Sequence, residues 1–172
     1  MKFIISIILY SLFIFNIKGD NVSTIIKFVK SKIGSGYIWG GFGQILTEPL
    51  LNELYEKYPN HIDKNIAKKW IGKEVYDNPG FVTKAFQQVN INIINDADEA
   101  WKKTHWVSKG TKSFLLKNSF VILYKYDDLQ GKMTETGIYL GGGIFIHAST
   151  EGVVMGNLPY TWTHWGTPKG LY

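Results

Sequence analysis

The sequence contains no cysteine among its 172 residues. It can therefore form no disulfide framework, no thiolate metal site and no cysteine nucleophile. It also contains no arginine, so all 19 basic residues are lysines. Lysine lacks the planar fork that makes bidentate contacts to phosphate or guanine, and the lysines form no long basic block. We therefore expect no nucleic-acid partner.

Long hydrophobic runs are also absent, except for one at the N-terminus over residues 3–15. This run is shorter than the roughly 20 apolar residues that a membrane-spanning helix needs, and Gly19 is a small residue suited to cleavage. We interpret residues 1–19 as a signal peptide. The protein is then expected to be secreted, to the medium or to a digestive vacuole, with no stable membrane insertion after cleavage. An uncleaved N-terminal anchor is the alternative.

The remaining residues, 20–172, have the composition of a single globular domain, because no segment is biased enough to be a linker. Hydrophobic periodicity first predicts helices and then strands. The expected helices begin near Val22, after Thr47, around Ile62 and at Asn78, where Asn78 is expected as the N-cap and Pro79 in the first turn. A glycine and aromatic loop is expected over residues 34–43. The expected strands cover residues 119–126, 136–140, 144–148 and 153–155, which gives an α+β domain.

Four motifs follow one another in this framework: Y-I-W-G-G, Y-D-N-P-G-F-V, T-E-T-G-I-Y-L-G and F-I-H-A-S. Their order resembles the NlpC family of papain-like cell-wall peptidases over nearly all of the chain after residue 19. The resemblance implies a papain-like, NlpC-type α+β fold, with helices packed on an antiparallel β-meander. Enzymes of that family cleave peptidoglycan stem peptides next to D-glutamate.

The resemblance also implies which positions correspond to the catalytic residues of the family. Its nucleophile is the cysteine of an Asp-Cys-Ser-Gly-Phe helix start, its base is a histidine before the Gly-Ile-Tyr-Leu-Gly segment, and a third polar residue orients that base. The corresponding residues here are Asn78, Glu135 and His147. A carboxamide does not ionise and is a feeble nucleophile, so the resemblance implies a catalytically dead form of the family.

Two alternatives to an inactive enzyme remain open. One is an active endopeptidase or amidase of the same fold that uses Thr134 or Thr136 as nucleophile, with Glu135 and His147. The other is a scaffold that binds a protein partner. No cofactor is expected, and a metal site formed by Glu135, His147 and His164 lacks the local spacing of known ligand motifs.

Binding can persist without catalysis, because the family's pocket uses the aromatic loop and the acid before the nucleophile. These positions are Tyr37, Trp39 and Asp77, of which Asp77 resembles the residue that pairs with a free substrate amine. The alternative for Tyr37 and Trp39 is that they are core aromatics. The sequence therefore predicts a secreted pseudoenzyme that binds stem peptides or muropeptides without hydrolysing them.

Overall fold

The computed structural model describes residues 21–115 and 119–172, so the expected signal peptide at residues 1–19 lies outside the described residues. Within the two described ranges, no helix is both long enough and apolar enough to span a membrane.

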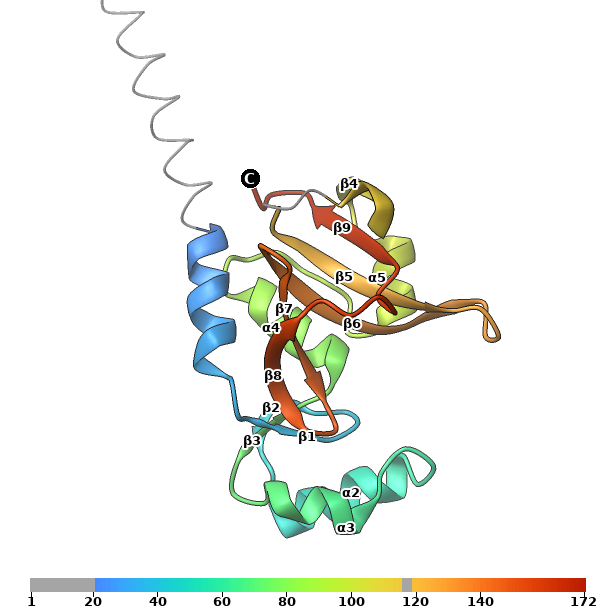
Figure 1. Ribbon diagram of the computed structural model, residues 1–172. Helices are drawn as coiled ribbons and strands as arrows, with labels where there is room; N and C mark the ends of the chain where they lie inside the picture. Colours follow the sequence, from blue (N-terminus) through green and yellow to red (C-terminus); the bar gives the residue numbers. More distant parts are fainter. Residues whose placement is uncertain (1–20, 116–118) are drawn as a thin grey trace, which may run out of the picture.

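The larger of the two sheets has six antiparallel strands in the order β4-β9-β5-β6-β7-β8 (Figure 1). Four consecutive strands form the expected meander, in which glycine turns allow short connections. The strands are β4 (Trp106–Thr111), β5 (Val121–Asp127), β6 (Lys132–Gly141), β7 (Ile144–Ser149), β8 (Gly152–Asn157) and β9 (His164–Pro168). Strands β4 and β9 were not expected, and β8 is longer than expected.

The core lies between this sheet and the helices. Helix α4 (Asn78–Gln87) contacts β6 and β7, and its apolar face is fully buried. Residues 21–31 are helical and join the same core through Ile25 and Val29, as their spacing predicts. The short helix α5 (Ala97–Lys103), which was not expected, contacts β6. The predicted α+β fold, with helices on an antiparallel meander, is confirmed.

The segment between the helix at 21–31 and α4 forms a smaller lobe (Figure 1). Contrary to the expected loop, residues 34–43 include strand β1 and part of β2, because both pair with β3 in a three-stranded sheet. Thr47 caps the next helix as expected, and the weaker amphipathic segment forms one α-helical turn followed by a 3₁₀ turn. The elements are β1 (Gly36–Tyr37), β2 (Phe42–Ile45), α2 (Glu48–Lys57), α3 (Lys64–Ala67), η1 (Lys68–Trp70) and β3 (Glu74–Tyr76).

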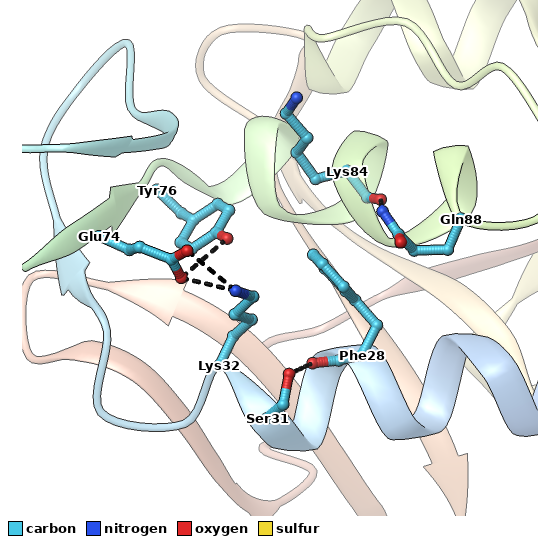
Figure 2. A network of polar contacts seen from close by, with 7 residues as sticks. All are labelled: Phe28, Ser31, Lys32, Glu74, Tyr76, Lys84 and Gln88. Atoms are coloured by element: carbon cyan, nitrogen blue, oxygen red, sulfur yellow. Dashed lines mark hydrogen bonds and ion pairs between the residues drawn. The ribbon is translucent and has the colours of Figure 1, made fainter.

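A polar network fixes β3 against the end of the N-terminal helix (Figure 2). The Lys32 ammonium donates to both carboxylate oxygens of Glu74, at 2.7 and 3.0 Å, and the Tyr76 hydroxyl donates to Glu74 at 3.4 Å. The Tyr76 ring is itself buried. Because Asp77 follows directly, this network helps to set the position where β3 passes into α4.

Candidate functional site

Asp77 lies at the junction of β3 and α4, and it is the N-cap of α4. This corrects the expectation that Asn78 caps the helix. One carboxylate oxygen of Asp77 accepts from the Gly80 amide at 2.7 Å, and the other accepts from the Gly40 amide at 2.9 Å. Both Asp and Asn are good N-caps, so composition alone did not distinguish the two neighbouring residues. The carboxylate of Asp77 thereby joins the start of α4 to the segment between β1 and β2.

The Asp77 carboxyl group is buried without a cationic partner. The residue is 8% exposed, and no ion pair among the described residues involves it. Burial raises the pKa of Asp77 to about 6, although its backbone hydrogen bonds act in the opposite direction. A buried carboxylate of this kind gains free energy from a cation that reaches it.

Asn78 occupies the first turn of α4 and is also buried. Its side-chain amide donates to the backbone carbonyl of Ala148 on β7. The carboxamide therefore acts as a bridge between the N-terminus of the helix and the sheet. It supplies neither an ionisable group nor a lone pair suited to attack.

His147 lies next to Ala148 on β7, and its ring is enclosed by aromatic rings. The ring centroids of Phe145 and Trp162 are 4.7 and 5.5 Å away, and Nδ1 of His147 is buried with no hydrogen-bond partner. Burial lowers the pKa of His147, and the negative charge of Glu135 only partly opposes this effect. The imidazole is therefore neutral at neutral pH, and the Trp162 ring packs against it edge-on.

Glu135 lies within β6 and faces Lys125, its register partner on β5. The Lys125 ammonium contacts the Glu135 carboxylate at 2.5 Å, and both side chains are about one-third exposed. The position that corresponds to the base is thus occupied by a carboxylate already engaged in an ion pair. Burial raises the pKa of Tyr37 to about 12, and the negative charges of Asp77 and Glu135 add to this effect.

The two threonines named as alternative nucleophiles also lie on β6. The Thr134 hydroxyl donates to the backbone carbonyl of Lys125 at 3.4 Å, and Thr136 is 2% exposed. Neither residue begins a helix, so neither receives activation from a helix N-terminus. No group of three or more metal-ligating side chains that could hold an ion occurs in the described parts of the chain.

A cleft of about 630 Å³ opens beside Asp77. Its walls come from the aromatic segment, the start of α4, the start of α5 and the turn before β6. They include Trp39, Asp77, Asn78, Asp96, Asp98 and Thr134. Asp96 and Asp98 could not be predicted from the sequence, because their position depends on how α5 packs against β6.

A second, smaller pocket of about 120 Å³ adjoins the cleft, and Trp39 and His61 line both spaces. The two rings are stacked, with centroids 4.1 Å apart and an interplanar angle of 14°. Trp39 is 37% exposed and Tyr37 is half-buried, so neither is a fully buried core aromatic. No local motif in the sequence indicates this contact, which joins residues 22 positions apart in the chain.

Comparisons with known proteins agree with this architecture. The sequence matches the model of the NlpC/P60 family over residues 34–166. A comparison with curated proteins gave no match.

Several solved structures share the fold. The P60 domain of the antigen MAP1204 from M. avium subspecies paratuberculosis has a TM-score of 0.60 at 15% identity, covering 88% of this chain and 96% of that one. NlpC1 from Trichomonas vaginalis has a TM-score of 0.57 at 21% identity, covering 87% of this chain but only 44% of that one. RipD from Mycobacterium tuberculosis, described as a non-catalytic NlpC/p60 domain protein adapted to peptidoglycan binding, has a TM-score of 0.57 at 15% identity, covering 87% and 97%.

The predicted family is thus confirmed by a match that extends over most of the chain and includes all the positions discussed above. The absence of cysteine agrees with a catalytically dead form, since the family normally consists of cysteine peptidases. The chain belongs to the NlpC/P60 family.

Proposed function

We propose that this protein is a secreted, non-hydrolysing member of the NlpC/P60 family that binds peptidoglycan stem peptides or muropeptides. The observation that carries the proposal is the buried Asp77 carboxylate, which has no cationic partner within residues 21–115 and 119–172 and opens onto a cleft beside a carboxamide at the nucleophile position.

The chemistry of the residues argues against hydrolysis. Attack on a peptide carbonyl needs an activated nucleophile and a base that takes its proton. Asn78 provides no nucleophile, and its amide is bound to Ala148. Glu135 is paired with Lys125 and has no nucleophile to activate. Because both the nucleophile and a free base are missing, we expect peptide hydrolysis only at the uncatalysed background rate.

The same cleft is suited to a ligand with a free amine. Asp77 is held rigidly by two backbone amides, and an ammonium that pairs with it replaces the water that burial has removed. A stem peptide released from its sugar has such an amine at its first residue. The similarity to RipD, whose described role is peptidoglycan binding without catalysis, supports this proposal.

Calorimetric titration tests both parts of the proposal. Protein purified after expression of the full-length chain is titrated with the tripeptide L-alanyl-γ-D-glutamyl-L-lysine and with a soluble muropeptide. We expect saturable heat without sustained thermal power. Asp77→Asn should abolish the tripeptide signal, whereas Asp128→Asn, an exposed acid that lines neither the cleft nor the pocket, should leave it unchanged.

Two results would contradict part of this proposal. Sustained power with cleaved product would establish a hydrolase, and its loss in Glu135→Gln would favour the threonine alternative. Absence of any heat would instead favour a protein partner. Secretion is tested separately, because N-terminal sequencing of the exported protein should begin directly after Gly19.

A further inference from the structure

The small pocket beside the cleft has an apolar lining that comes mainly from two parts of the chain. The aromatic segment contributes Tyr37 and Trp39, and the region from α2 to η1 contributes Ile62, Ile66 and Ala67. Two of these side chains are partly open to solvent, since Ile66 is 49% and Trp39 is 37% exposed. Covering them with an apolar group removes that surface from water.

The pocket adjoins the cleft onto which Asp77 opens, because Trp39 and His61 line both spaces. The Asp77 carboxylate accepts from the Gly40 amide at 2.9 Å, and Gly40 directly follows Trp39. The charge of Asp77 also acts on Tyr37, which lines the pocket. In a peptide, the α-amine and the side chain of the first residue are bonded to the same carbon atom. When the amine of that residue pairs with Asp77, its side chain can therefore extend past the Trp39 and His61 rings into the small pocket.

The size of the pocket indicates what kind of side chain it accepts. An apolar protein cavity of about 150 Å³ holds a benzene molecule. A pocket of about 120 Å³ therefore has room for three or four carbon atoms, whereas an alanine methyl group leaves most of it unfilled. Unfilled apolar space forgoes dispersion contacts with its lining.

We propose that this pocket is a specificity subsite for a branched aliphatic side chain on the first residue of a peptide whose amine pairs with Asp77. The inference rests on the proposed function. The pocket is larger than an alanine side chain needs, and the inference assigns the selectivity to Ile66 and to the Trp39–His61 stack. Both Ile66 and His61 lie in the segment between β2 and β3.

Three tripeptides that differ only in their first residue test this inference: L-alanyl-, L-valyl- and L-leucyl-γ-D-glutamyl-L-lysine. Each buried methylene contributes about fourfold in affinity. The valyl peptide should therefore bind about tenfold more tightly than the alanyl peptide, and the leucyl peptide at least as tightly as the valyl one. Calorimetry of the purified protein measures all three dissociation constants.

Variants locate the effect in the pocket. Ile66→Ser should weaken binding of the valyl and leucyl peptides and leave the alanyl peptide nearly unchanged. His61→Ala removes one wall and should reduce the same preference. Ile71→Ser is the matched control, because Ile71 is also exposed but lines neither the pocket nor the cleft. Asp77→Asn should abolish binding of all three peptides.

The outcomes separate this inference from the proposed function. Binding of the alanyl peptide with equal or weaker binding of the other two would overturn the subsite and leave the proposed function intact. A preference for bulky side chains that persists in Ile66→Ser would also overturn the subsite. If none of the three peptides binds, both proposals fail.

Discussion

Replacing Asp77 by asparagine should change how stability depends on pH. The folded protein holds a proton on this carboxyl group up to about pH 6, whereas an unfolded chain releases it near its ordinary pKa of 3.8. Stability therefore falls as the pH rises through this window, because the folded state binds more protons than the unfolded state. At about 1.4 kcal/mol for each tenfold change in the ionisation constant, the full effect is about 3 kcal/mol.

Most of this loss in the free energy of unfolding falls within a pH range in which stability is easily measured. Between about pH 4 and about pH 7.5, the wild-type protein should lose about 2 kcal/mol relative to Asp77→Asn. Urea denaturation of both proteins at the two pH values gives the difference, and contributions from other groups, including His147, cancel in the comparison. Asparagine remains a good N-cap, so α4 should persist. A difference between the two proteins that does not change with pH would refute the account of Asp77 as a desolvated carboxyl group.

Three further predictions concern the first turn of α4. Asn78→Cys alone should hydrolyse no muropeptide, because the base position is still Glu135; product detected by mass spectrometry would contradict this. Asn78→Ala should cost about 1 to 3 kcal/mol in urea denaturation, because the buried Ala148 carbonyl loses its donor. Gly80→Ala should destabilise by about 3 kcal/mol or more, since its Cβ would lie 2.3 Å from the Gly41 carbonyl oxygen; a wild-type denaturation midpoint would refute that contact.

The sequence predicted those elements whose burial follows a regular period. Helix α4 and strands β5 to β7 carry long apolar patterns, because each packs one or both faces into the core. Strands β1 and β2 were missed because they are short, glycine-rich and defined by pairing with the distant β3. Helix α5 was missed because it has only seven residues, of which two alanines are its buried positions.

The sequence named candidate residues for the site but not their geometry. Motif order assigned Asp77, Asn78, Glu135 and His147 to the site, although the expected strand at 136–140 did not include Glu135, which lies within β6. It did not reveal the ion pair of Glu135 with Lys125, because register across two strands decides that contact. The sequence also did not indicate the stacking of His61 on Trp39, because this contact depends on how the segment between β2 and β3 folds back onto the aromatic segment.

The two neighbouring residues Asp77 and Asn78 contribute to stability in opposite ways, and this contrast bears on function. Asn78 stabilises the fold through a buried hydrogen bond to β7. Asp77 caps α4, but its burial without a cation costs stability at neutral pH. A carboxamide would remove the charge, but it has only one acceptor oxygen and could satisfy only one of the Gly80 and Gly40 amides. The carboxylate therefore has a structural role as well as a cost. An ammonium group that reached it from the cleft would offset that cost, which is what the proposed function expects.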